Sequence, residues 1–170
     1  MTAPSSGPEP LAPNPSVSDG RGPIAFLDQA LWRDLMTAET AEAFGAAWLT
    51  LACRVISGAV AGVLLLTKDS AAPDPVATWP AGGLADPGLL ASGHHAVKDG
   101  RGIVQPPSSA QLLLRAAYPI QLDGAVVGAV AIDVEPSAAR DPRETMRQLQ
   151  WSVAWVRDFL RRQASAAGRG

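Results

Sequence analysis

Cysteine and histidine are both scarce in this chain of 170 residues. It contains one cysteine, Cys53, and two adjacent histidines, His94 and His95. A single cysteine excludes a disulfide within the chain and every zinc site that is built from several cysteines. Adjacent residues of a helix point about 100° apart, so the two histidines do not readily serve one metal ion. We therefore expect neither a metal site nor a cofactor.

Long apolar runs and a strong charge imbalance are also missing. No run reaches the roughly 18–20 residues of a membrane span, and the N-terminus lacks the basic start and apolar stretch of a secretory signal. The formal net charge is only −2, which is unlike a protein that coats nucleic acid. Hydrophobic residues make up 47% of the chain, enough to form a core. We expect a cytoplasmic globular protein with no nucleic-acid partner and no membrane insertion.

Proline is concentrated at the N-terminus. Residues 1–23 hold six of the 15 prolines, at positions 4, 8, 10, 13, 15 and 23, and serine and glycine fill much of the rest. Such a composition cannot bury enough apolar surface to offset the entropy of ordering. We predict a disordered tail over residues 1–23, one domain over 24–163 and a disordered C-terminus over 164–170.

Apolar residues at three- and four-residue spacings predict four helices. The first begins at Ile24 and includes Leu35. The second is capped by Thr37 and ends at Ser57-Gly58. The third covers residues 84–97, with Asp86 and Pro87 at its start, and the last covers residues 141–163, with Asp141 as cap and Pro142 at the first position.

Strands are predicted between these helices. The run "AVAGVLLLTKD" is apolar without alternation, which is typical of a strand buried on both faces. "PVATWP" and "GIVQPP" predict two short strands. In "LLLRAAYPIQLDGAVVGAVAIDVEP", Asp123-Gly124 fits a two-residue hairpin turn of type I′. That turn would place Leu122 opposite Ala125, Ile120 opposite Val127 and Tyr118 opposite Ala129.

This element order resembles the GAF domain, a sensory module of bacterial signalling. The matching pieces are "AVAGVLLLTKD", "PVATWP", "GRGIVQPP" and above all "YPIQLDGAVVGAVAIDVE", and the resemblance covers about residues 35–162. PAS and roadblock-like domains also have an antiparallel sheet with flanking helices, but their element order fits less well. The resemblance implies an α+β fold. We expect an antiparallel sheet of five or six strands, the N- and C-terminal helices on one face, and a pocket covered by a helix and loops on the other.

Candidate ligand-binding residues are few. The resemblance places His94 and His95 near the pocket, where one of them could hydrogen-bond an anionic ligand or ligate haem. The plainer alternative is a solvent-facing pair, or one packed and one exposed histidine. Trp79, Gln105 and Tyr118 are amphipathic residues near predicted strand ends and could line a small-molecule pocket or simply pack. Cys53 lies in an apolar helix, where a free cysteine is commonly a small core residue. No catalytic set is apparent, so we expect no enzyme activity.

The last predicted helix carries more apolar surface than one sheet contact needs. One stripe includes Leu149 and Val153, and a second contains Trp151, Trp155 and Phe159. We expect a homodimer through the terminal helices, with an interface that includes Trp32, Leu35, Trp151 and Trp155. The alternative is that Trp32 and Trp151 close the core of a monomer. The leading functional hypothesis is a non-catalytic signalling domain that binds an unknown small molecule or regulates a partner protein by contact. The alternative is an interaction module with a collapsed pocket and no ligand.

Overall fold

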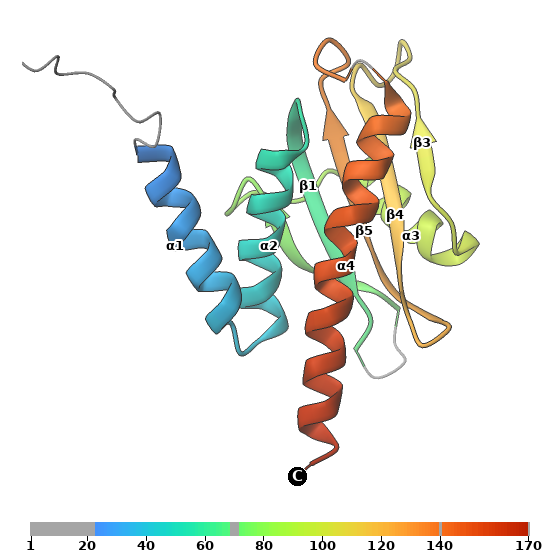
Figure 1. Cartoon of the computed structure of the whole chain (residues 1–170). Coiled ribbons are helices and arrows are strands. Elements are labelled where there is room, and N and C mark those ends of the chain that lie inside the picture. Colours follow the sequence, from blue (N-terminus) through green and yellow to red (C-terminus); the bar gives the residue numbers. More distant parts are fainter. Residues whose placement is uncertain (1–22, 69–71, 140, 170) are drawn as a thin grey trace, which may run out of the picture.

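The computed structural model describes residues 23–68, 72–139 and 141–169. Of the tail predicted over residues 1–23, residues 1–22 lie outside it, and Pro23 begins the first helix. The described residues form one antiparallel sheet of five strands in the order β2-β1-β5-β4-β3 (Figure 1). The α+β prediction is confirmed, with five strands. In chain order the strands are β1 (Ala59–Leu66), β2 (Asp74–Trp79), β3 (Ile103–Gln105), β4 (Leu114–Leu122) and β5 (Ala125–Val134).

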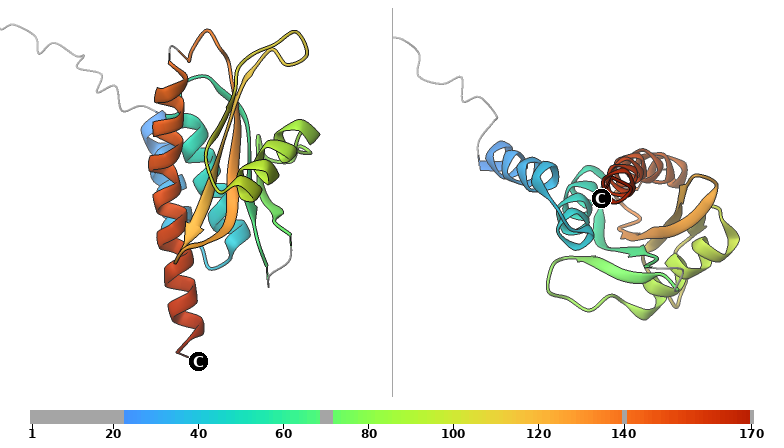
Figure 2. Two further views of the ribbon diagram at one scale, coloured as in Figure 1. Left: turned by 90° about the vertical axis from the view of Figure 1, so that its right-hand side faces the viewer. Right: turned by 90° about the horizontal axis from the view of Figure 1, so that it is seen from below.

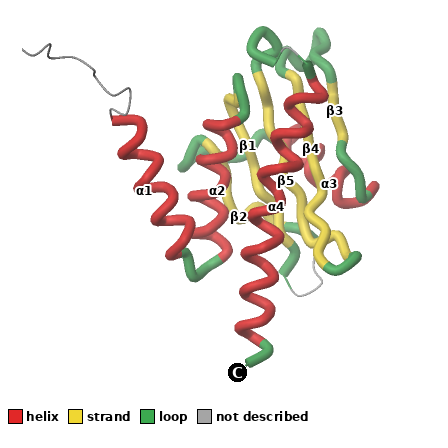
Figure 3. Tube along the Cα trace, viewed as in Figure 1, coloured by secondary structure: helices red, strands yellow, loops and turns green. Residues whose placement is uncertain are grey.

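Helices cover both faces of this sheet. Helices α2 (Ala41–Val55) and α4 (Pro142–Ala167) lie on one face, and α3 (Pro87–Asp99) lies on the other, as the side view in Figure 2 shows. Helix α1 (Pro23–Thr37) packs along α2, outside the layer that touches the sheet (Figure 3). None of these helices is long and apolar enough to span a membrane within the described residues.

Several helix ends differ from their predicted positions. Helix α3, predicted over residues 84–97, runs from Pro87 to Asp99. Thr40, and not Thr37, caps α2, since its hydroxyl accepts a hydrogen bond from the Ala43 amide at 3.1 Å. The Thr37 hydroxyl instead donates to the Arg33 carbonyl at 2.8 Å, within the last turn of α1. Helix α4 continues to Ala167, so the expectation that disorder begins at residue 164 is wrong for the first four of those residues.

The β4–β5 hairpin confirms the turn but not the whole register. Asp123 and Gly124 have φ of 51° and 83°, and Leu122 pairs with Ala125 as predicted. Ile120, however, pairs with Gly128, and Tyr118 pairs with Val130, because the register shifts next to Gln121. The shift leaves an extra residue, Val127, in β5. Its carbonyl accepts hydrogen bonds from both the amide and the hydroxyl of Thr67, at 2.8 and 3.0 Å.

Two apolar clusters result from this register. The larger lies between the sheet and helices α2 and α4, and includes Phe44, Trp48, Leu49, Leu64, Ile120, Ile132, Leu149, Val156 and Phe159. The smaller lies under α3 and consists of Val63, Leu65, Leu89, Ala96, Ala117, Ala129 and Ala131. The α3 side of the sheet is thus lined mainly by alanine, which lets this helix lie close to the strands.

Candidate functional site

The four residues predicted to bind a ligand lie on two faces of the sheet. Trp79, at the end of β2, and Tyr118, in β4, pack against the larger cluster on the α2 and α4 side. His94 is exposed on α3, and Gln105 is exposed in β3, where its side-chain oxygen accepts a hydrogen bond from Ser92 of α3 at 3.0 Å. The fold therefore does not bring the four together. Ligand binding at any one of them stays a prediction.

Helix α3 lies directly on the sheet. A methyl group added at Gly93 would come within 2.6 Å of a Leu65 methyl carbon. Leu89 and Ala96, on the same side of α3, are fully buried. There is no room for a side chain at position 93, so the space beneath this part of α3 is filled.

An ion cluster closes the N-terminal end of α3 against the sheet. The Arg115 guanidinium of β4 donates two hydrogen bonds to Asp133 of β5, at 2.7 and 2.9 Å, and one to Asp86 at 3.1 Å. Asp86 also caps α3 by accepting hydrogen bonds from the Gly88 and Leu89 amides. The hydrogen bonds to Asp133 are the main reason that the pKa of Arg115 is raised above its ordinary value. The cluster fixes α3 to the central strands.

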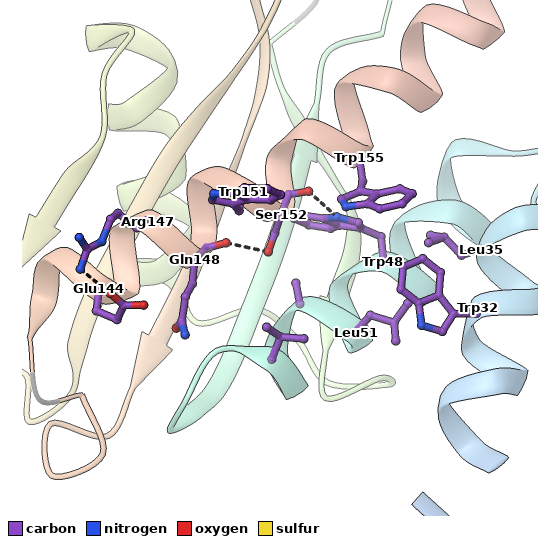
Figure 4. A pocket seen from close by; sticks show the side chains of 12 residues that line it. Trp32, Leu35, Trp48, Leu51, Glu144, Arg147, Gln148, Trp151, Ser152 and Trp155 are labelled. Carbon is purple, nitrogen blue, oxygen red and sulfur yellow. Dashed lines mark hydrogen bonds and ion pairs between the residues drawn. The ribbon is translucent and has the colours of Figure 1, made fainter. Parts of the chain in front are cut away.

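The opposite, helical side of the molecule carries a large cavity, of about 610 Å³, between α1, α2 and α4 (Figure 4). We call it the tryptophan groove. Its lining is mostly aromatic and aliphatic, with a polar end on the first turns of α4. The lining residues are Trp32, Leu35, Trp48, Leu51, Ala52, Val55, Glu144, Arg147, Gln148, Trp151, Ser152 and Trp155.

The floor of the tryptophan groove is rigidly held. Trp48 of α2 is 3% exposed, and its indole Nε1 donates to the Ser152 carbonyl of α4 at 2.8 Å. Leu35 of α1 is buried beside it. At the polar end, Arg147 and Glu144 form an ion pair one turn apart on α4. The floor thus joins all three helices.

The rim of the tryptophan groove is exposed. Trp151 is 79% exposed, Trp155 46% and Trp32 43%. Trp32 and Trp155 meet edge to face across the groove, with ring centroids 5.4 Å apart (Figure 4). Tryptophan rings in water are unusual on a protein surface of this size, and a patch of them marks a contact site.

The residues predicted for a dimer interface are therefore adjacent in space. Trp32, Trp151 and Trp155 form the rim, while Leu35 is buried within the single chain and forms part of the floor. The alternative that Trp151 closes the core of a monomer does not hold for the single chain. Phe159, assigned to the same stripe, does close the core, since its ring stacks on Phe44 with centroids 3.9 Å apart.

Sequence analysis missed the part of the groove that α2 supplies. Trp48, Leu51 and Val55 form one stripe at helical spacing, which predicts a buried face. Only Trp48 is fully buried, and Val55 is 65% exposed. One side of this stripe packs toward the core, and the other side lines the groove.

The remaining candidate groups show no reactive environment. Cys53 is buried against Gly62, and burial raises the pKa of its thiol to about 12. His95 pairs with Asp99 on the surface of α3 at 3.0 Å. Among the described residues, no group of three or more histidine, cysteine, aspartate or glutamate side chains is arranged to hold a metal ion.

Comparison with known proteins gives structural matches alone. No family model and no curated protein sequence matches this chain. Among solved structures, the GAF domain of the potassium sensor histidine kinase KdpD from Escherichia coli superposes with a TM-score of 0.57 at 17% identity, over 85% of this chain and 98% of that one. The GAF domain of a putative sensor histidine kinase from Pseudomonas syringae pv. tomato gives a TM-score of 0.57 at 14% identity, over 90% and 97%.

An enzyme is among the similar structures. The fRMsr protein of Staphylococcus aureus, in its reduced form, superposes with a TM-score of 0.56 at 13% identity, over 80% of this chain and 94% of that one. Identities this low establish architecture and leave activity open. From the shared sheet and the shared placement of its helices, the chain has the GAF fold.

Proposed function

We propose that this chain is a non-catalytic regulatory domain of a signalling system, and that it acts through contacts made by its helical side. The observation that carries the proposal is the tryptophan groove, where three partly exposed indole rings surround an apolar cavity. Aromatic residues are the side chains most enriched at the energetic centres of protein interfaces. A surface of this composition is suited to binding a protein segment.

The packing of α3 on the other face of the sheet also favours a site on the helical side. Gly93 and Ala96 bring α3 onto an alanine-lined sheet, and the Arg115–Asp133 pair fixes its N-terminal end. A ligand beneath α3 would have to lift the helix and break these contacts. A site that works by contact on the helical side needs no such change.

The similar structures fit a regulatory role. KdpD and the Pseudomonas protein are described as a sensor histidine kinase and a putative one. Their domains offer a functional parallel to the proposal. The proposal includes a location in the cytoplasm. The similarity to fRMsr is at 13% identity and is one of architecture, so it does not alter the proposal.

The partner that we propose for the helical side is a second copy of this chain. The rim residues Trp32, Trp151 and Trp155 supply a self-complementary aromatic surface, and pairing of two copies would remove these rings from water. Twofold pairing through one shared patch is the commonest form of protein association.

Sedimentation at micromolar concentration tests this pairing. The unmodified chain should sediment as a dimer, and the double variant Trp151→Glu/Trp155→Glu should sediment as a monomer with an unchanged circular dichroism spectrum. Leu84→Glu is the matched control, because Leu84 is fully exposed and lies outside the groove. A monomeric parent, or a double variant that still dimerises, would refute the proposed dimer.

A small-molecule ligand in the tryptophan groove is a second candidate. The cavity volume of about 610 Å³ lies within the range of ligand pockets. A ligand bound there should change the fluorescence of the rim tryptophans in the parent but not in Trp151→Glu/Trp155→Glu. Ligand binding that survives in the double variant would place the site elsewhere.

A further inference from the structure

The proline-rich segment at the N-terminus and the tryptophan groove have matching chemistries. Residues 4–15 contain prolines at positions 4, 8, 10, 13 and 15, and residues 10–13 have the pattern Pro-x-x-Pro. Segments of this kind favour the extended polyproline II helix and bind grooves lined by aromatic rings. The groove presents Trp32, Trp151 and Trp155 around such a surface. We propose that residues 4–15 bind in the tryptophan groove of the same chain and compete there with a partner.

The rim presents aromatic rings from two helices. Trp151 and Trp155 stand one turn apart on α4, about 6 Å along the helix axis, and Trp32 faces Trp155 from α1. In a polyproline II helix Pro10 and Pro13 lie on the same side, about 9 Å apart. The proline spacing is longer than the rise from Trp151 to Trp155, so the match between segment and groove rests on the aromatic character of the rim and not on a register of rings. The segment carries one charge, on Glu9, so few charges would need to be desolvated.

The chain connection makes the contact feasible. Helix α1 begins at Pro23 and forms one wall of the groove. Trp32 lies nine residues into this helix, or about 14 Å along its axis. The eight-residue link from Pro15 to Pro23 spans about 25 Å when extended, which is enough to turn back along α1 to Trp32. A tether this short raises the local concentration of the segment to the millimolar range, so that even a weak affinity would populate the contact.

Binding of the segment would regulate the function proposed above, and this part of the inference rests on that function. A groove occupied by residues 4–15 cannot at the same time receive a second copy of the chain. Self-association would then require release of the segment, and its measured affinity would fall in proportion to the fraction of chains in which the groove is free.

Three full-length proteins test the proposal. The first is the parent, the second carries Pro→Ser at positions 4, 8, 10, 13 and 15, and the third is a control with Ser→Ala at positions 5, 6, 16 and 18, which keeps every proline. Each is prepared with and without Trp151→Phe, so that the signal of Trp151 is obtained by difference. Acrylamide quenching of tryptophan fluorescence is measured below micromolar concentration, and self-association by sedimentation across a concentration series.

The proposal expects Trp151 to be protected from acrylamide in the parent and in the serine control. The proline variant should show at least a twofold larger quenching constant for Trp151 and a dimer dissociation constant several-fold lower. A synthetic peptide of residues 1–22, added to the proline variant, should restore the protection. Equal quenching in all three proteins, with no effect of the peptide, would overturn the inference.

The two proposals fail in different ways. If all three proteins dimerise with the same affinity and equal quenching, the groove binds a second copy and the segment has no role, so the inference is wrong and the proposed dimer stands. If none dimerises and Trp151 is protected only where the prolines are present, the segment occupies the groove and the proposed dimer is wrong.

Discussion

Removal of the Asp133 carboxylate should destabilise the fold far more than removal of the Asp86 carboxylate. Both groups accept hydrogen bonds from the same guanidinium, that of Arg115. They differ in burial, since the side chain of Asp133 is 5% exposed and that of Asp86 is 58% exposed. Replacing each aspartate in turn therefore compares a buried with an exposed partner of the same guanidinium, with nearly the same atoms changed.

The expected costs follow from this difference. In Asp133→Asn the Arg115 guanidinium, itself 8% exposed, loses its bidentate partner and meets an amide N–H₂ in place of one oxygen. Loss of one member of a buried ion pair costs about 3–5 kcal/mol. Asp86→Asn keeps the helix cap, because asparagine is an equally good cap, and removes an exposed ion pair that contributes about 1 kcal/mol or less.

Urea unfolding followed by circular dichroism measures both values. For a domain of this size, a loss of about 3 kcal/mol corresponds to a fall of about 10 °C in the melting temperature. The double variant Arg115→Met/Asp133→Leu should cost less than Asp133→Asn alone, since no buried charge then remains. Equal costs for Asp133→Asn and Asp86→Asn, within about 0.5 kcal/mol, would refute the assignment of a buried cluster.

Three further outcomes are expected. Gly124→Val should destabilise the chain by about 1–3 kcal/mol in urea unfolding because φ is 83° there, whereas Gly124→Asn should be nearly neutral; equal effects would argue against a conformational cause. Cys53 should not react with a disulfide reagent at pH 8 until urea unfolds the chain, because burial raises its pKa to about 12; rapid labelling of the native state would contradict this. The Leu89 amide, then the Gly88 amide and Arg115, hold the pKa of Asp86 below its usual value, so its stabilising effect is present above pH about 3.9 and is lost as the pH falls through the lower folded pKa. Asp86→Asn should therefore show a weaker acid-induced loss of stability than the parent, and identical acid profiles would exclude this role.

Local sequence signals predicted most of the fold because they act within a few residues. The Asp123-Gly124 turn, the Asp141-Pro142 helix start and the Asp86-Pro87 start are each determined by backbone preferences. The exact hairpin register was not predictable from the turn. It depends on the Val127 bulge, whose carbonyl bonds to Thr67 of a strand that is 60 residues away in sequence.

The candidate site was predicted in part. Exposed tryptophans on α4 were identifiable because Trp151 and Trp155 fall outside the Leu149–Val153 stripe. The expected pocket residues failed to meet because the face on which a side chain lies depends on register, and Tyr118 and Trp79 lie on the helical side. The contribution of α2 was hidden, since an apolar stripe has the same pattern whether it covers a sheet or lines a groove.

The hydrogen bond from the Trp48 indole to the Ser152 carbonyl has a mechanical consequence. It joins two residues that are 104 positions apart in sequence, and its donor ring is held by packing, since Trp48 is 3% exposed. Sliding α4 by one residue would displace the carbonyl by about 1.5 Å and break the bond, while leaving the helix itself intact. The two helices can keep this hydrogen bond only by moving together, so any displacement of α4 along its axis that leaves α2 in place costs a contact in the floor of the groove.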